Sequence, residues 1–300
     1  MTSMFSQSEK KLQKIFHCGA TFFYKNESHE IITSGKPSPS KGECKTDLYI
    51  KTIDKSGVEH EIKLSIKQLN ADFLENKMSA ERATQIFGYD AKKIITHSLD
   101  EIATNFTDDP LILFKKQGRT EAKTIKIGWK FELLNKKSGL KSGLIDLTEE
   151  QIIDVYSGTN LPIDKKNSSI DSSEIKGSGI ANTILFIDPL NNLKNIQSYV
   201  DEIQDITDYC KGKKVFFACK AINYRITKDK WDGNRPLAVW IDWHLDNDIL
   251  YGEFNFSSPL QMKADVIGAN IRKILSQLKI TEDNFNELQN KLSSKIIIHK

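Results

Sequence analysis

The sequence has little cysteine and no long apolar run. Its four cysteines lie at scattered positions and form no Cys-x-x-Cys pair, namely Cys18, Cys44, Cys210 and Cys219. This pattern argues against a cysteine-based zinc site and against a secreted disulfide scaffold. The chain also lacks an apolar run suited to a signal peptide and any run of about 20 apolar residues able to span a bilayer. We therefore expect a soluble cytoplasmic protein without a membrane partner.

An excess of charge of one sign is also missing. The 300 residues include 43 Lys and Arg against 40 Asp and Glu, which gives a net charge of +3, so the chain as a whole is not polybasic. A hydrophobic content of 39% is enough to bury one sizeable core or two modest ones. Helical and strand-like patterns alternate along the chain without an internal repeat. The sequence therefore predicts an α+β protein.

Residues 41–67 form the most informative segment, because they predict a β-hairpin. Polar and apolar residues alternate over 47–53 and again over 61–67. A loop of three residues, 55–57, ends at Gly57, which supplies the left-handed conformation that closes such loops. The register that follows pairs apolar with apolar residues and lysine with a carboxylate: Lys51 with Glu61, Ile50 with Ile62, Leu48 with Leu64, and Asp47 with Ser65.

This register chooses between two candidate half-motifs on the second strand. Glu61-Ile62-Lys63 has the acid-x-lysine form, whereas Ser65-Ile66-Lys67 has a serine in place of the acid. A metal-dependent nuclease needs an acid to hold the metal and a lysine near the scissile phosphate. Because Asp47 falls opposite Ser65, we predict Asp47, Ser65 and Lys67 as catalytic residues. Glu61 and Lys63 are the alternative half-motif.

The tracts Lys45-Thr46-Asp47-Leu48 and Leu64-Ser65-Ile66-Lys67 resemble the catalytic core of type II restriction endonucleases of the PD-(D/E)XK superfamily. Some branches of that group carry a serine where the acid normally stands. The resemblance covers roughly residues 35–90. It implies a restriction-endonuclease-like core, a central mixed sheet flanked by helices, in which Asp47 and the Ile66 carbonyl hold Mg²⁺, or Mn²⁺ in its place, and Lys67 is the catalytic lysine.

The serine at position 65 leaves the metal in need of a further carboxylate, since a hard cation binds several oxygen ligands. Two residues are candidates for this ligand. Glu75 lies in the segment after the second strand, and Glu43 lies just before the hairpin. The sequence does not choose between them.

The surrounding pattern supports the same core. A helix is predicted over 6–16, a strand over 20–25, and a helix that begins after Ser79 and ends at Gly88. We therefore assign residues 1–160 to the nuclease core. Residues 161–300 form an α+β extension that either continues the sheet of the core or makes a DNA-recognition subdomain. The serine-rich segment 157–178 is predicted to be a loop or linker.

Two segments are predicted to contact DNA. Residues 114–143 hold nine basic and two acidic residues around a strand predicted at 124–134. The residues expected to contact phosphates are Lys115, Lys116, Arg119, Lys126, Lys130, Lys136, Lys137 and Lys141. Asn234 and Arg235 follow in a turn made basic by Arg225, Lys228 and Lys230. Asn and Arg read adenine and guanine edges, so we expect this turn to contact bases.

These features together predict a Mg²⁺-dependent endonuclease that cleaves double-stranded DNA at a defined sequence, as a type II restriction enzyme does. Double-strand cuts need two active sites, so a homodimer is expected, and a cognate methyltransferase would act on the same site. Three alternatives stay open. They are a repair or anti-phage nuclease that recognises DNA structure or modification, a non-catalytic DNA-binding module, and an α+β domain unrelated to nucleic acid.

Overall fold

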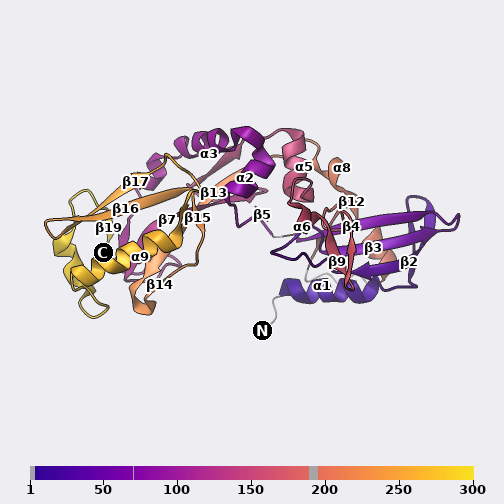
Figure 1. Cartoon of the computed structure of the whole chain (residues 1–300), viewed down its shortest axis with the longest axis horizontal. Coiled ribbons are helices and arrows are strands. Elements are labelled where there is room, and N and C mark those ends of the chain that lie inside the picture. The colour runs from indigo at the N-terminus through magenta and orange to yellow at the C-terminus, as the bar shows by residue number, and fades with distance from the viewer. Residues whose placement is uncertain (1–3, 70, 189–194) are drawn as a thin grey trace. The chain divides into compact units, whose positions relative to one another are not determined.

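The chain folds into two units, each built from two separate stretches of sequence. The computed structural model describes residues 4–69, 71–188 and 195–300 (Figure 1). The first unit combines Met1–Asp72 with Leu147–Lys213, and the second combines Phe73–Asp146 with Lys214–Lys300. The mixed α+β class expected from the sequence is confirmed. The expected division into 1–160 and 161–300 differs from the one observed, because both units are discontinuous.

The first unit contains a six-stranded mixed sheet. Its elements in chain order are α1 (Met4–Ile15), β1 (Thr21–Tyr24), β2 (Glu27–Gly35), β3 (Leu48–Asp54), β4 (Glu59–Gln68), α5 (Glu149–Ser157), α6 (Ile163–Lys166), β9 (Ser168–Ile170), β10 (Ser173–Ile175), β11 (Thr183–Ile187), α7 (Ile196–Val200), β12 (Gln204–Asp205) and α8 (Ile206–Cys210). The strand order is β1-β2-β3-β4-β11-β12. β11 runs parallel to β4, and the other neighbours are antiparallel.

The β3–β4 hairpin has the register predicted from the sequence. The observed pairs include Leu48 with Leu64, Ile50 with Ile62, and Lys51 with Glu61. At the turn, the Asp54 N–H donates to the Val58 carbonyl at 3.0 Å, and Gly57 has a φ of +84°. The turn therefore has the three-residue form, and the alternation of side chains fixes which face of the hairpin is buried.

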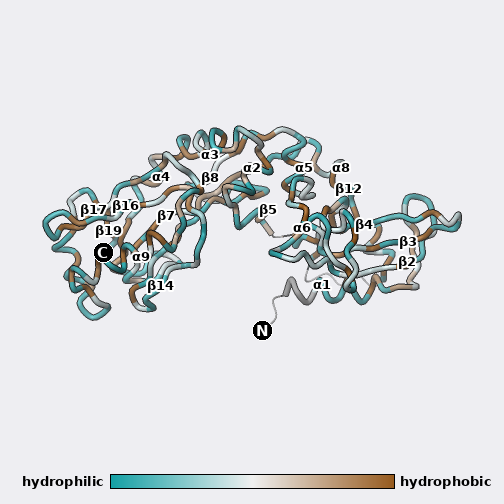
Figure 2. Tube along the Cα trace, in the orientation of Figure 1, coloured by the Kyte–Doolittle hydropathy of each residue, from teal (hydrophilic) through white to brown (hydrophobic). Residues whose placement is uncertain are grey.

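Helices cover both faces of this sheet. On one face, Leu12 and Phe16, at the end of α1 and just after it, pack with apolar side chains of β2, β3, β4 and β11 in one core. On the other face, the ring of Phe186 in β11 lies 5.2 Å from that of Tyr209 in α8, and Tyr209 contacts Tyr156 of α5. Figure 2 shows hydrophobic and hydrophilic residues interleaved along these strands. The sheet is thus a central layer between helices.

The segment 157–178, predicted to be a linker, is instead folded into the first unit. It contains α6 and the β9–β10 hairpin. Ser168 and Ser178 are fully buried; the Ser178 hydroxyl donates to the Ser168 carbonyl at 2.8 Å and accepts from the Ser168 N–H at 3.0 Å. The serines of this segment therefore form hydrogen bonds with buried main-chain groups. A short hydroxyl side chain can bond a main-chain N–H or C=O in place of another main-chain group.

The second unit is built around a larger, mainly antiparallel sheet, in which only β19 and β6 pair in parallel among the described strands. Its elements are β5 (Phe73–Glu75), α2 (Ala80–Phe87), η1 (Gly88–Asp90), α3 (Ala91–Asp100), α4 (Thr104–Thr107), β6 (Ile112–Leu113), β7 (Thr124–Leu134), β8 (Ser142–Ile145), β13 (Val215–Arg225), η2 (Ile226–Lys228), β14 (Lys230–Trp231), β15 (Pro236–Leu237), β16 (Val239–Asp246), β17 (Ile249–Asn255), β18 (Met262–Lys263), α9 (Ala264–Gln277), η3 (Phe285–Lys291) and β19 (Ile298–His299). The central strand order is β14-β13-β7-β16-β17. Within the described ranges, no helix combines the length and apolar character required to cross a membrane.

The helix predicted after Ser79 is present as α2, with the Ser79 hydroxyl accepting from the Arg82 N–H at 3.0 Å. It belongs to the second unit, so it is not the helix that follows β4 in the first unit. That place is taken by α5, which begins with a capping box between Thr148 and Gln151. The insertion of residues 73–146 therefore separates β4 from α5 in sequence.

Candidate active site

Asp47 lies directly before β3, beside the end of β4. Its N–H donates to the Leu64 carbonyl at 2.8 Å, and its Oδ2 accepts from the Ile66 N–H at 2.7 Å. The N–H and C=O of one strand residue point to the same side of the strand, so the Ile66 carbonyl also faces the edge at which Asp47 stands. The hairpin thus brings together a carboxylate and a main-chain carbonyl, two oxygen ligands of the kind that Mg²⁺ prefers.

The environment of Asp47 raises its pKa to about 6. The largest cause is desolvation, since protein atoms surround the partly accessible carboxylate closely. The Lys67 ammonium and the Ile66 N–H oppose this effect, the charge of Glu9 adds to it, and the Lys36 ammonium opposes it more weakly. A carboxyl group with a pKa near neutrality, close to lysines, is typical of a functional site.

Glu9 supplies a second carboxylate to this site. It lies on α1 with an exposed fraction of only 8%, and Lys36, which follows β2, donates to its Oε2 at 2.8 Å. Desolvation lowers the pKa of Lys36, but the hydrogen bond and charge of Glu9, with the charge of Asp47, leave it raised overall. Lys36 therefore provides positive charge to both carboxylates, as a bound cation would.

The donor set fits a hard divalent cation. Glu9, Asp47 and the Ile66 carbonyl offer oxygen atoms from three elements, α1, the start of β3, and β4. Ser65 is fully buried, and its Oγ has no hydrogen-bond partner within the described parts of the chain. Because a buried polar atom costs free energy until it is paired, this hydroxyl directly before Ile66 is a polar atom still to be satisfied.

The two carboxylates proposed from the sequence as the further ligand lie in different parts of the chain. Glu75 lies on β5 in the second unit, where its Oε2 is 3.4 Å from Nε of Arg82. Glu43 lies exposed in the loop before β3. Within the first unit, Glu9 is a carboxylate whose charge acts on Asp47.

The alternative half-motif lies further along β4, toward the hairpin turn. Glu61 accepts a hydrogen bond of 2.6 Å from the Tyr49 hydroxyl, and its other oxygen lies 3.6 Å from Nζ of Lys63. Lys51, which is opposite Glu61 in the register, forms its ion pair with Glu59 at 2.6 Å. Glu61 and Lys63 are thus paired with each other, whereas Asp47 is hydrogen-bonded to Ile66, the residue before Lys67.

The basic residues predicted to contact phosphates divide into two groups. Lys126 is buried and lies 2.7 Å from Asp109, which also pairs with Lys141 at 2.9 Å, and Lys130 pairs with the buried Glu132. These three lysines have acidic partners inside the unit, and Lys126, which was expected to contact phosphates, is buried. The remaining members are exposed: Lys115, Lys116, Arg119, Lys136 and Lys137.

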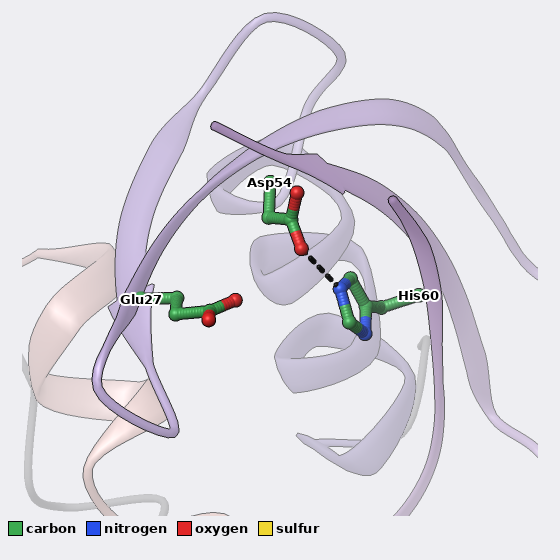
Figure 3. Close-up of side chains that lie close together, drawn as sticks. All are labelled: Glu27, Asp54 and His60. Atoms are coloured by element: carbon green, nitrogen blue, oxygen red, sulfur yellow. Dashed lines mark hydrogen bonds and ion pairs between the residues drawn. The ribbon is translucent and has the colours of Figure 1, made fainter. Parts of the chain in front are cut away.

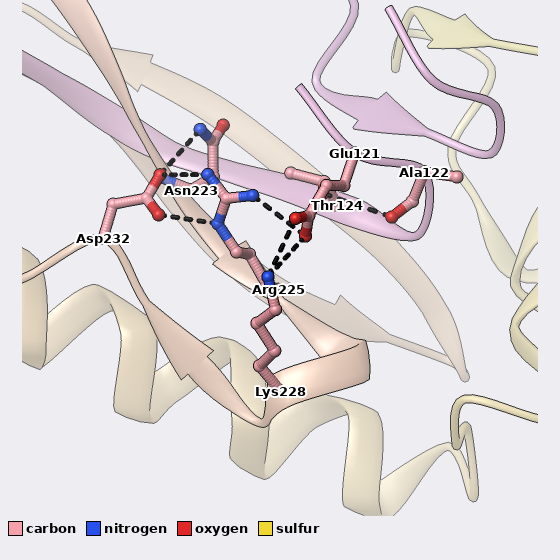
Figure 4. A network of polar contacts seen from close by, with 7 residues as sticks. All are labelled: Glu121, Ala122, Thr124, Asn223, Arg225, Lys228 and Asp232. Carbon is pink, nitrogen blue, oxygen red and sulfur yellow. Dashed lines mark hydrogen bonds and ion pairs between the residues drawn. The ribbon is translucent and has the colours of Figure 1, made fainter. Parts of the chain in front are cut away.

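The turn predicted to read bases is held by contacts within the second unit. Asn234 donates from its side chain to Oδ2 of Asp265 at 2.8 Å, at the start of α9. Arg225 lies between two carboxylates, 2.7 Å from Asp232 and 3.1 Å from Glu121. Figure 4 shows this network. The main-chain carbonyl of Arg235 accepts from the Ala264 N–H at 2.9 Å. The side chain of Asn234 thus positions α9.

Sequence reasoning missed Glu9 and Lys36. For Glu9 a signal was present: it lies three residues before Leu12 and seven before Phe16, so it falls on the apolar face of an amphipathic helix. A carboxylate on that face must have a partner. Lys36 carries no comparable signal, because nothing in the sequence places the end of β2 beside α1.

Comparisons with protein families, with curated proteins and with solved structures found no match to this chain.

Proposed function

We propose that this protein is a Mg²⁺-dependent endonuclease that hydrolyses phosphodiester bonds in double-stranded DNA. One observation carries the proposal: Asp47, with Glu9 and Lys67 within electrostatic range, is hydrogen-bonded to the main chain of Ile66. Paired carboxylates and a neighbouring lysine are the groups that metal-assisted phosphate hydrolysis requires.

The order of elements in the first unit supports the same proposal. Helix α1 precedes the antiparallel strands β2, β3 and β4, which carry the candidate site, and helix α5 leads to β11, parallel to β4. A mixed sheet between helices is the arrangement implied by the resemblance to PD-(D/E)XK nucleases. Residues 73–146 of the second unit are then an insertion between the site-bearing hairpin and the next helix of the core.

Each residue has a defined task in this proposal. Glu9, Asp47 and the Ile66 carbonyl would hold Mg²⁺, which when bound lowers the pKa of a coordinated water. Lys67 orients the attacking water and offsets the negative charge that develops on the phosphate. Lys36 neutralises the two carboxylates while the site is without substrate. Its side chain is half exposed, so solvent and reactants can reach the carboxylates from its side.

The second unit offers the DNA-contacting charge. Lys115, Lys116 and Arg119 stand exposed in the loop between β6 and β7, and Lys136 and Lys137 stand in the loop after β7. Such residues bind phosphates without reading sequence. Sequence discrimination therefore needs groups other than this cationic surface.

Unmethylated plasmid DNA incubated with the purified protein and Mg²⁺, followed by sequencing of fragment ends, tests the proposal. Fragments that share an end sequence support a site-specific restriction enzyme. Cleavage without a shared end sequence supports a nuclease that recognises structure or modification. Plasmid that stays intact with both Mg²⁺ and Mn²⁺ contradicts the proposal, and salt-dependent binding of intact DNA would then favour a non-catalytic binding module.

A further inference from the structure

A second group of metal-ligating side chains lies at the other end of the β3–β4 hairpin. Glu27, Asp54 and His60 converge there, with their ligand atoms all within 4.8 Å of one another (Figure 3). Asp54 ends β3, whereas Asp47 precedes it, so the two sites are separated by about 20 Å along the strand at roughly 3.3 Å per residue. The group is therefore distinct from the candidate active site.

Two hairpin turns position these residues. Glu27 is the first residue of β2, directly after a turn in which Lys25 and Asn26 have φ values of 48° and 68°. Positive φ at both central residues gives the tight two-residue hairpin turn. Asp54 and His60 flank the neighbouring β3–β4 turn. The ligands thus come from two adjacent turns at the same end of one sheet.

Asp54 is oriented as a metal ligand would be. Its Oδ1 accepts three hydrogen bonds from the turn, from the Ser56 N–H, the Ser56 hydroxyl and the Val58 N–H. Its Oδ2 faces Nε2 of His60 at 2.8 Å. Hydrogen bonds from Ser56, His60 and Val58 lower the pKa of Asp54, so the carboxylate is ionised. The turn thus holds Oδ1 of Asp54, and Oδ2 is directed at His60. Carboxylates that bind metal ions are commonly supported by hydrogen bonds in this way.

His29 supports the imidazole of His60. Its ring lies edge-on to that of His60 with centroids 4.9 Å apart. Nε2 of His29 lies 3.2 Å from the Tyr24 carbonyl, which can only accept, so Nε2 carries the proton and Nδ1 accepts from the Thr52 hydroxyl at 3.0 Å. Both nitrogens of His29 are thus engaged, and His60 is the imidazole that remains for a cation.

A pocket of about 430 Å³ opens at this place, and its carboxylates outnumber the neighbouring lysines even though Glu59 pairs with Lys51 and Glu61 with Lys63. Glu27 and His60 line it, together with three further carboxylates, Glu59, Glu61 and Asp205, and one lysine, Lys25. A concave surface lined by carboxylates concentrates cations. The pocket also leaves room for water or an anion beside a bound ion.

We propose that Glu27, Asp54 and His60 bind a divalent transition-metal ion of the Zn²⁺ or Co²⁺ type. An imidazole nitrogen with two carboxylate oxygens suits these ions better than Mg²⁺ or Ca²⁺, which favour oxygen ligands alone. Three protein ligands leave one tetrahedral position open toward the pocket. In the bound state the ion takes the place of the hydrogen bond between Asp54 and His60, whose proton passes to solvent, and it ties the β1–β2 turn to the β3–β4 turn.

Titration of the purified full chain with Co²⁺, followed by visible absorption, tests this site, because low-symmetry Co²⁺ complexes absorb strongly. We expect one strongly absorbing ion per chain in the wild type, beside any ion held by the all-oxygen candidate active site, and loss of the strong bands in both His60→Gln and Glu27→Gln. Glu27 is exposed, so the second variant keeps the fold if the first does not. Asp47→Asn serves as the matched control and should keep the bands, since it alters only the candidate active site.

Thermal unfolding gives a second readout that does not depend on nuclease activity. Zn²⁺ at saturating concentration should raise the unfolding temperature by about 5 °C or more in the wild type and in Asp47→Asn, but not in His60→Gln. The proposal is contradicted if Co²⁺ gives no bands, or if bands and Zn²⁺ stabilisation persist in both His60→Gln and Glu27→Gln. The Asp54–His60 contact would then be an ion pair of the turn alone.

Discussion

The main-chain N–H of Ile66 donates a hydrogen bond of 2.7 Å to the Asp47 carboxylate, although 19 positions separate the two residues. This contact exists only in the register that pairs Leu48 with Leu64. A slip of one residue would turn Asp47 away from Lys67 and move the apolar side chains to the wrong face. The candidate site therefore depends directly on the strand pairing of the hairpin.

Replacing Asp47 with Asn should abolish cleavage while stabilising the protein at neutral pH. The pKa of Asp47 is raised from 3.8 to about 6, so the folded state favours the neutral form. One pKa unit corresponds to about 1.4 kcal/mol, and the free energy of unfolding should rise by about 2–3 kcal/mol in Asp47→Asn at pH 8. Chemical denaturation of both proteins measures this difference.

The stability gained in Asp47→Asn should depend on pH with a definite sign. The folded protein binds the extra proton of Asp47 between about pH 4 and pH 6, so the stability contributed by the protonated form is present at low pH and lost as pH rises through about 6. The difference between Asp47→Asn and the wild type should accordingly shrink toward zero near pH 4. An equal difference at pH 4 and pH 8 would contradict the raised pKa.

Cleavage by the wild type should rise with pH over the same range. Asp47 must be ionised to hold Mg²⁺, so at pH 5, one unit below its pKa, the single-turnover rate should be about tenfold lower than at pH 8. More Mg²⁺ should move the rise to lower pH, because metal and proton compete for the carboxylate. A rate that is flat from pH 5 to pH 7 at low Mg²⁺ would exclude Asp47 as the ligand.

Glu9→Gln should raise the Mg²⁺ concentration needed for cleavage by about tenfold or more. The change removes one of the two carboxylates of the cluster and keeps the shape of the side chain. Glu43→Gln and Glu75→Gln, the ligands considered from the sequence, are the matched controls and should leave the requirement unchanged. Mg²⁺ titration of the cleavage rate compares all three. A shift in Glu75→Gln but not in Glu9→Gln would assign the second carboxylate to the other unit.

The two groups of basic residues in the second unit should respond differently to substitution. Lys126→Ala removes the buried partner of Asp109 and should lower the free energy of unfolding by about 2–3 kcal/mol.

Lys115→Ala with Lys116→Ala should leave stability nearly unchanged and weaken DNA binding. The salt slope of binding should decrease by about 0.9 for each phosphate that the double variant fails to neutralise. DNA binding of the wild type and of the double variant, measured against salt concentration, gives this slope. An unchanged slope in the double variant would show that the loop with Lys115 and Lys116 does not contact DNA.

The hairpin was predictable because its information is local. Alternation over 47–53 and 61–67, with Gly57 in the turn, sets the register without reference to the rest of the chain. The same holds for the cap at Ser79 and the strand at 124–134, which ends where the sequence predicts. Periodicity and turn chemistry act over a few residues, so they report on elements of this kind.

The assembly of elements was not predictable for a complementary physical reason. β4 pairs with β11 across residues 69–182, which include an inserted part of the second unit, and no local pattern records which distant strand completes a sheet. Lys126 was expected to contact phosphates, and its burial beside Asp109 was not foreseen because Asp109 lies outside the basic segment. Glu9 was missed in the same way, since α1 reaches the site only through the packing of Leu12 and Phe16 on the sheet.

Comparison of Lys67→Ala with Lys63→Ala tests the central claim most directly. Both lysines lie on β4 and, because an even number of positions separates them, on the same face, and Lys63 is paired with Glu61. Single-turnover cleavage of plasmid DNA with Mg²⁺ should fall by about 10²–10³-fold or more in Lys67→Ala and stay near the wild-type rate in Lys63→Ala. Cleavage by Lys67→Ala at the wild-type rate would contradict the assignment of the active site.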